Sequence, residues 1–208
     1  NSNATIKIQP YLDADVRNED SNYGEKFWDE VERKAQGNEA YIVTKTKKLD
    51  FHVGYGMRYN IYLNGSRYDF SPTVVDRDKY VGSHFSIDVN AGDELTLVKY
   101  AAVISSLNFE KGTFAKVIAG LLDIAIGKGY DLMLKEQAEA WANIWAHSDI
   151  TIEGDVAAQQ AIRFNIFQLS QTYTGKDERL NIGPKGFTGE KYGGSTYWDT
   201  EAYCLPFY

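Results

Sequence analysis

The chain has 208 residues, of which 43% are hydrophobic and 25% are charged, a composition typical of globular proteins. Its formal net charge of -7 argues against nucleic acid or an anionic membrane surface as a partner, because both attract clusters of Lys and Arg. No apolar run approaches the roughly 20 residues that span a bilayer, so we expect no membrane partner.

The first half of the chain alternates between apolar and polar residues, which is typical of β-strands. Residues 5–8, 41–44 and 52–55 predict short strands with period two. The clearest hairpin joins residues 59–63 to residues 66–70. Asn64 and Gly65 connect them, and this pair favours a type I′ turn.

A second hairpin is predicted further along the chain. Residues 85–89 and 95–100 both alternate, and Ala91, Gly92 and Asp93 lie between them. We therefore expect the chain to be β-rich and antiparallel up to about Ser106.

A helical period replaces the alternation after Ser106. Apolar residues from Phe114 to Ala125 form one stripe, which is closed by Gly127 and Gly129. Residues 130–145 form a second stripe that includes Trp141 and Trp145. We expect these two indoles to pack against the sandwich rather than to bind a cofactor.

Two further helices are predicted in the last third of the chain. Asp155 can cap the first of them, whose apolar residues include Phe164 and Phe167 on different sides. This distribution predicts a helix that is buried nearly all round. The second begins near Tyr197, after a polar, glycine-rich loop.

The C-terminal segment carries the strongest functional signal. Trp198 is followed by Asp199, and Glu201 lies two residues further on. An indole face packs on the C–H groups of a sugar ring, while a carboxylate accepts hydrogen bonds from its hydroxyls. Trp198 and Asp199 are therefore candidate ligand contacts. The structural alternative is a helix start, where the dipole favours acidic residues.

Glu201 is a weaker candidate than Asp199. Side chains two apart on a helix point roughly 200° apart, so Asp199 and Glu201 do not form a facing catalytic pair.

Other motifs point to no second site. Residues 183–189 lack the spacing of a nucleotide-binding P-loop, and the acidic stretch 13–23 lacks the central glycine and final glutamate of an EF-hand loop. The three histidines show no metal-ligand spacing. Cys204 is the single cysteine, which fits a reducing compartment.

The tail resembles a known family. Residues 178–194 (ERLNIGPKGFTGEKYGG) and 197–201 (YWDTE) are similar to glycoside hydrolase family sixty-five. Ser195, where many relatives have histidine, resembles the branch that acts on maltose. The likeness covers the whole chain, since three further stretches also resemble the family: residues 10–13 with 18–23, residues 128–131, and residues 141–150.

The resemblance implies an α+β multi-domain fold, in which an antiparallel β-sandwich is followed by a helical linker and an (α/α)6 barrel. We expect residues 1–110 to be part of the N-terminal sandwich and residues 111–152 to be the linker. Residues 153–208 would then be the first barrel helices. This reading predicts a fragment whose apolar C-terminal residues lack partners. We expect residues after Asp155 to dock on other molecules, to be mobile, or to pack on the rest of the parent protein.

The resemblance also implies an activity, inverting phosphorolysis of maltose to β-glucose 1-phosphate and glucose. Its partners would be maltose and inorganic phosphate, with no metal or organic cofactor, in a cytoplasmic homodimer. By family position, Trp198 and Asp199 would hold the non-reducing glucose. The catalytic acid and the phosphate-binding residues belong to later motifs, so no catalytic residue is expected in this chain.

Two alternatives stay open at this point. The parent could act on trehalose, kojibiose or nigerose, either as a phosphorylase or as a hydrolase. From a different class, the chain could be a non-catalytic carbohydrate-binding sandwich with a helical appendage.

Overall fold

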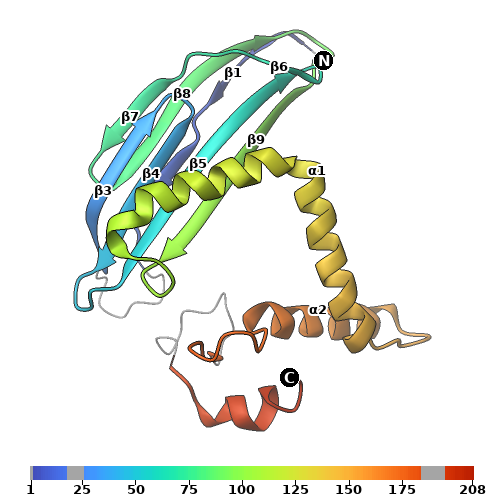
Figure 1. Cartoon of the computed structure of the whole chain (residues 1–208). Coiled ribbons are helices and arrows are strands. Elements are labelled where there is room, and N and C mark those ends of the chain that lie inside the picture. Colours follow the sequence, from blue (N-terminus) through green and yellow to red (C-terminus); the bar gives the residue numbers. More distant parts are fainter. Residues whose placement is uncertain (1, 18–25, 184–194) are drawn as a thin grey trace. The chain divides into compact units, whose positions relative to one another are not determined.

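The computed structural model describes residues 2–17, 26–183 and 195–208. They belong to two compact units. The sandwich unit contains residues 2–17 and 26–133, and the helical unit contains residues 134–183 and 195–208. The order of elements, with antiparallel sheets first and helices after them, confirms the predicted fold class (Figure 1).

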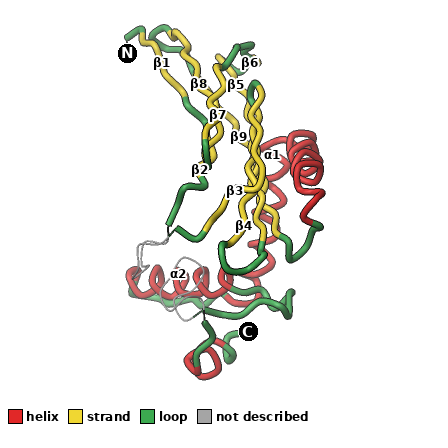
Figure 2. The backbone as a smooth tube through the Cα atoms, turned by 90° about the vertical axis from the view of Figure 1, so that its left-hand side faces the viewer, coloured by secondary structure: helices red, strands yellow, loops and turns green. Residues whose placement is uncertain are grey.

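Two antiparallel sheets face each other in the sandwich unit (Figure 2). The first contains β1 (Ala4–Ile8), β2 (Tyr11–Asp13), β7 (Thr73–Arg77) and β8 (Tyr80–Val89). The second contains β3 (Trp28–Gln36), β4 (Glu39–Thr46), β5 (His52–Leu63), β6 (Ser66–Arg67) and β9 (Leu95–Ser105). Each sheet has a central strand, because β8 pairs with β1, β2 and β7 while β5 pairs with β4, β6 and β9.

The first predicted hairpin is confirmed. Asn64 and Gly65 both have positive φ angles, of 50° and 77°, as a type I′ turn requires. Leu63 pairs with Ser66 across the turn and Tyr62 pairs with Arg67. The second arm is shorter than predicted, because β6 ends at Arg67.

The second predicted hairpin is wrong. Strands β8 and β9 follow each other in the sequence but belong to different sheets. Instead, β9 pairs with β5 over eleven positions, from Val53 opposite Ser105 to Leu63 opposite Leu95. A turn sequence reverses the direction of the chain without choosing the partner strand, and here the long β5 strand provides the larger pairing surface.

The core between the sheets follows the period-two alternation of the strands. Tyr59 and Ile61 of β5 and Phe85 and Ile87 of β8 are buried together. The hydroxyl groups of Tyr59 and Ser83 lie 2.6 Å apart and hydrogen-bond to each other, so that neither is buried without a partner.

A helix covers the opposite face of the second sheet. A short 3-10 turn, η1 (Lys111–Thr113), leads into α1 (Phe114–Ser148), whose N-terminal half lies along this face (Figure 2). Phe114, Ile118 and Leu122 are spaced four residues apart and are at most 3% exposed. They pack on side chains of β4 and β9, so the second sheet is buried on both faces.

Two glycines of β5 let the helix lie this close to the sheet. A Cβ atom at Gly54 would lie 2.8 Å from Cδ2 of Phe114, and one at Gly56 would lie 2.1 Å from Cγ2 of Ile118. Both distances are well below the roughly 3.5–4.0 Å optimum between carbon atoms. The missing side chains therefore set the distance between helix and sheet.

The two predicted helical stripes meet at Gly129. Its φ and ψ angles of 76° and 164° are not helical, and α1 is kinked there. A positive φ of this size costs other residues energy, which explains why the sequence has glycine at the end of the first stripe. Further along α1, Trp141 packs on Phe167 of α2, with ring centroids 4.9 Å apart.

Helix α2 (Val156–Thr172) begins as predicted. A side-chain oxygen of Asp155 accepts a hydrogen bond from the backbone N–H of Ala158 at 2.9 Å, which is an N-cap. Arg163 donates two hydrogen bonds to the carboxylate of Asp149, at 2.6 and 2.9 Å.

The predicted burial of α2 on nearly all sides is wrong. Ile166 is its one buried residue, whereas Phe164 is 58% exposed and Val156 is 86% exposed. Apolar residues all around a helix indicate that it packs on partners on several sides. The described residues of the helical unit cover one side of α2, the side that carries Ile166.

The close approach of α1 to β5 generates a testable prediction. We expect Gly56→Ala to lower the free energy of unfolding of the chain by about 2 kcal/mol, because its methyl group overlaps the buried Ile118. Urea unfolding measures the change. The control is Gly120→Ala, since Gly120 has open space around the added methyl group; it should raise stability by roughly 0.5–1 kcal/mol. An equal loss for Gly56→Ala in an Ile118→Ala background would contradict this explanation.

Candidate functional site

Trp198 and Asp199 open a short helical stretch at the end of the chain. The helix begins near Tyr197, as the sequence predicts, and continues as the π-helical segment η3 (Thr200–Cys204). Trp198 is 66% exposed. Asp199 is half-buried with helical φ and ψ angles, and its side chain makes no capping hydrogen bond. Its carboxylate is therefore not used to cap the helix.

A buried hydroxyl anchors this segment. Thr200 is 6% exposed, and its Oγ1 donates a hydrogen bond to the backbone carbonyl of Ile182 at 3.0 Å. Close by, the side-chain amide of Asn181 donates to Oγ1 of Thr196, also at 3.0 Å. The residues before and after Trp198 and Asp199 are thus tied to the preceding loop.

A second anchor lies at the other end of the segment. The Tyr208 hydroxyl donates a hydrogen bond to the Leu169 carbonyl in α2 at 2.7 Å. The Tyr208 ring also meets the ring of Tyr173 edge to face, with centroids 5.5 Å apart. The predicted exposure of the tail is confirmed for Tyr203, Leu205 and Tyr208, which are 69%, 54% and 44% exposed, whereas Phe207 is half-buried.

The π turn is a feature that sequence reasoning missed. The backbone N–H of Leu205 donates to the carbonyl of Thr200, five residues earlier, at 3.0 Å. The ring of Tyr203 then lies beside that of Trp198, with centroids 5.9 Å apart and ring planes tilted by 51°. The five-residue spacing of the two aromatic residues is the one sequence signal for this arrangement.

The rest of the tail motif is described only in part. Residues 184–194, which carry most of the glycine-rich stretch, and residues 18–23 of the acidic stretch lie outside the described residues. Within the described part, Arg179 forms an ion pair with Asp177. Hydrogen bonds from the Arg179 side chain and backbone lower the pKa of Asp177 to about 2. The ion pair orders the start of the loop without supplying a group that titrates near neutral pH.

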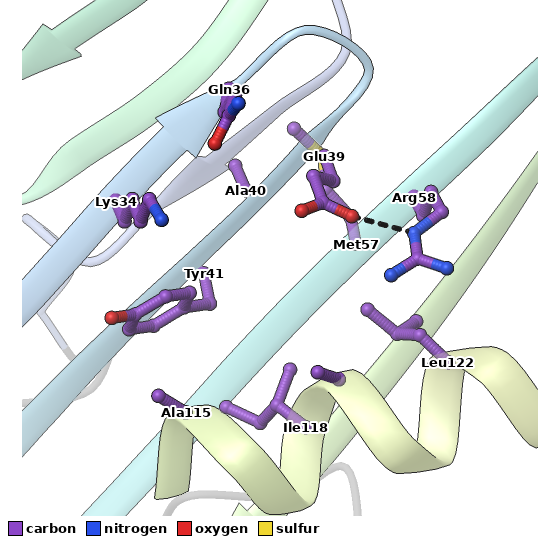
Figure 3. A pocket seen from close by; sticks show the side chains of 11 residues that line it. Lys34, Gln36, Glu39, Ala40, Tyr41, Met57, Arg58, Ala115, Ile118 and Leu122 are labelled. Atoms are coloured by element: carbon purple, nitrogen blue, oxygen red, sulfur yellow. Dashed lines mark hydrogen bonds and ion pairs between the residues drawn. The ribbon is translucent and has the colours of Figure 1, made fainter.

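The sandwich unit contains a separate cleft. It has a volume of about 230 Å³ and lies between α1 and the strands β3, β4 and β5 (Figure 3). Met57, Ile118 and Leu122 contribute to its apolar wall, while Lys34, Glu39 and Arg58 lie at its rim.

Arg58 and Glu39 at this rim are held in ion pairs. Arg58 donates hydrogen bonds to Glu39 at 2.7 Å and to Asp123 at 2.6 Å (Figure 3 shows the first). Burial lowers the pKa of Arg58, but the two carboxylates outweigh it and the pKa is raised. Burial, together with a hydrogen bond to Glu32, raises the pKa of the nearby Tyr41 to about 12. Neither Arg58 nor Tyr41 can therefore exchange a proton near neutral pH, so the cleft is a weaker candidate than the tail segment.

The structure gives no sign of a metal centre in the part of the chain that it describes. In residues 2–17, 26–183 and 195–208, no three His, Cys, Asp or Glu side chains gather as potential ligands. Over the same residues, no helix combines the length and hydrophobicity needed to cross a membrane.

Comparison with known protein families shows to which family the chain belongs. The profile of the "Glycosyl hydrolase family 65, N-terminal domain" matches residues 1–144, which is more than half of the chain. The profile of the "Glycosyl hydrolase family 65 central catalytic domain" matches residues 163–208. The chain belongs to glycosyl hydrolase family 65. The second match includes Trp198 and Asp199, so the candidate ligand contacts lie in the part related to the family's catalytic domain.

Relatives within family 65 carry the names of several disaccharide phosphorylases. The chain is 40% identical to the maltose phosphorylase of Bacillus subtilis over 205 residues, which are 99% of this chain and 27% of the relative. It is 32% identical to the alpha,alpha-trehalose phosphorylase of Thermoanaerobacter brockii over 190 residues, 90% of this chain and 24% of the relative. The chain thus spans about a quarter of the length of these relatives.

A solved structure shares the fold. A protein from the human microbiome, provisionally described as a kojibiose phosphorylase, superimposes with a TM-score of 0.86 over 100% of this chain and 26% of its own length. The two sequences are 26% identical. The antiparallel sheets followed by helices are therefore shared with a protein that is described as acting on kojibiose rather than on maltose.

The Thr200 anchor can be tested directly. We expect Thr200→Val to leave the Ile182 carbonyl buried without a partner, at a cost of about 1–3 kcal/mol, and so to loosen the segment that carries Trp198 and Asp199. Hydrogen exchange of the amides in residues 198–205 should become faster. Thr200→Ser, which keeps the hydroxyl, is the matched control and should exchange nearly as slowly as the unchanged chain. Equal exchange in both variants would show that the hydroxyl is not the anchor.

Proposed function

We propose that the protein containing this chain is an inverting disaccharide phosphorylase that converts maltose and phosphate into β-glucose 1-phosphate and glucose. The observation that carries the proposal is the 40% identity to a maltose phosphorylase over 99% of the chain. The likeness to the trehalose phosphorylase is weaker in both identity and coverage.

In this proposal, Trp198 and Asp199 hold the non-reducing glucose. The indole of Trp198 is exposed and can pack on the C–H face of a sugar. Asp199 is half-buried and does not cap the helix, so its carboxylate can accept hydroxyl protons. The Thr200 anchor keeps both side chains in place before sugar binds, which reduces the entropy lost on binding.

The reaction needs one proton donor and one nucleophile. A carboxylic acid protonates the glycosidic oxygen as the bond to the anomeric carbon breaks, while a phosphate oxygen attacks that carbon from the opposite face. Phosphate takes the place of the water that a second carboxylate activates in hydrolytic enzymes, so one catalytic carboxyl group is enough. We do not assign this role to Glu201, which is exposed and follows the proposed sugar contact by two residues.

In a second candidate function, the protein is a phosphorylase of the same family that acts on a different disaccharide. The trehalose phosphorylase relative and the solved structure described as a kojibiose phosphorylase favour this alternative. The match of residues 163–208 to a catalytic domain argues against a purely binding sandwich module. The cytoplasmic location, the homodimer and the absence of a cofactor stay predictions from the sequence.

The whole protein provides the test of the proposed activity. We expect release of glucose and β-glucose 1-phosphate from maltose, with no glucose released when phosphate is left out. Trehalose, kojibiose and nigerose should react at least tenfold more slowly, a difference of about 1.4 kcal/mol in transition-state binding. Glucose release without phosphate would identify a hydrolase. A faster reaction with another disaccharide would show that this disaccharide, and not maltose, is the preferred substrate.

The isolated chain of 208 residues serves as a control for this assay. It carries the proposed sugar contacts but no assigned acid or phosphate site, so we expect no phosphorolysis. Activity of the isolated chain would show that the catalytic groups have been placed wrongly.

The role of Asp199 leads to a separate prediction. In the whole protein, Asp199→Ala should lower kcat/KM by about 10², because a charged hydrogen bond to a hydroxyl is lost together with the positioning of the ring. Asp199→Asn should be nearly as harmful if the carboxylate accepts two hydroxyl protons. Glu201→Gln changes a neighbouring exposed carboxylate and is the matched control. Steady-state kinetics with maltose and phosphate give the comparison, and normal values for both Asp199 variants would reduce Asp199 to a helix-start role.

A further inference from the structure

We infer that Tyr203 is a further residue of the sugar site, and that the rings of Tyr203 and Trp198 together form an aromatic corner that contacts the disaccharide. This inference rests on the proposed function, because it assigns an additional specificity-determining residue to the same site.

The backbone brings the two rings together. In a regular α-helix, residues five apart are separated by about 140° around the axis and do not lie on one face. The hydrogen bond from Leu205 N–H to the Thr200 carbonyl closes a π turn that includes Tyr203 and begins two residues after Trp198. This wider turn changes the angle around the axis between the two residues, and the ring of Tyr203 lies 5.9 Å from the Trp198 ring, centroid to centroid. Single π turns inside helices are frequent at functional sites.

The residues that the structure describes leave most of the surface of the two rings uncovered. Trp198 is 66% exposed and Tyr203 is 69% exposed, although each is a large aromatic side chain. Their planes are tilted by 51°, so they form an open corner rather than a closed stack. Two faces set at an angle can contact two sides of one sugar, or two linked sugars whose rings are not coplanar.

The neighbouring groups favour a sugar over a protein surface as the occupant of this corner. Asp199 lies next to Trp198, and its side chain makes no capping hydrogen bond. An apolar protein surface that covered the rings would bury this carboxylate without a partner, which is costly. Sugar hydroxyls would instead donate hydrogen bonds to the Asp199 carboxylate while the C–H groups cover the rings.

The corner is held at both ends, as a binding site requires. The Thr200 hydroxyl fixes the start of the π turn to Ile182, and the Tyr208 hydroxyl fixes the residues after it to Leu169. The aromatic corner is therefore preorganised, and Tyr203 should contribute to disaccharide affinity and choice without affecting phosphate binding.

The experiment compares three variants of the whole protein. Tyr203→Leu removes the aromatic face but keeps an apolar side chain, and Tyr203→Phe restores the face without the hydroxyl. Tyr130→Leu is the matched control, because Tyr130 is also highly exposed, at 59%, but lies in α1 of the sandwich unit. Kinetics are measured with maltose and with phosphate as the varied substrate, and thermal unfolding is followed in parallel.

We expect Tyr203→Leu to raise the KM for maltose by about tenfold while the KM for phosphate stays unchanged. Tyr203→Phe should bring the KM for maltose back to within about threefold of the original value, and Tyr130→Leu should leave both constants unaltered. An unchanged KM for maltose in Tyr203→Leu would overturn the inference. So would a lowered Tm together with equal changes in both KM values, since this pattern indicates a packing role.

Failure of the inference can be told apart from failure of the proposed function. If the unaltered protein phosphorolyses none of the four disaccharides, the proposed function fails, and calorimetric titration with maltose then tests the corner alone. Weaker maltose binding in Tyr203→Leu, restored in Tyr203→Phe, would still support the aromatic corner. If Tyr203→Leu and Tyr203→Phe bind maltose with equal affinity, the aromatic corner is rejected.

Discussion

The close contact between α1 and β5 is the constraint on which the sandwich unit depends. Gly54 and Gly56 leave room for Phe114 and Ile118, so the helix buries one face of the second sheet while the first sheet buries the other. Strand β5 is the centre of this sheet, because it pairs with β4 from His52 to Arg58 and with β9 from Val53 to Leu63. The cleft beside α1 is a consequence of this packing, because its apolar wall consists of side chains at the edge of the same contact.

The candidate sugar site depends on a different kind of constraint. Its segment has few buried side chains, so hydrogen bonds rather than hydrophobic burial hold it in place. Thr200 and Tyr208 each donate to a backbone carbonyl, one in the loop before the segment and one in α2. Trp198 and Asp199 directly precede the first anchor, and Tyr203 lies between the two. Because the anchors hold the backbone, these three side chains need not do so. Such an arrangement leaves the two aromatic rings and the carboxylate oxygens of Asp199 available to a ligand.

Family membership and substrate choice rest on different observations. Matches over residues 1–144 and 163–208 establish the family, and they include the tail motif that suggested it. Substrate choice depends on the shape of the whole sugar site, for which Trp198 and Asp199 are the candidate contacts in this chain. The maltose and trehalose phosphorylases match this chain in sequence, and the structure described as a kojibiose phosphorylase matches it in fold, so family membership does not separate these disaccharides.

Local signals in the sequence determined the elements whose physics is local. The Asn64-Gly65 turn, the Asp155 cap and the break at Gly129 depend on backbone angles and hydrogen bonds within a few residues, and the structure confirms all three. Trp198 and Asp199 could be named as candidates from residue types alone, because indole and carboxylate groups suit sugars wherever they lie.

Only the tertiary structure decided which distant residues meet. Strand β9 pairs with β5 rather than β8, the two glycines of β5 lie beneath α1, and Tyr203 lies beside Trp198 across a π turn. The physical reason is that these arrangements depend on competition between whole surfaces for burial and pairing. A short stretch of sequence can specify a turn or a cap, but it carries no information about the partner that wins this competition.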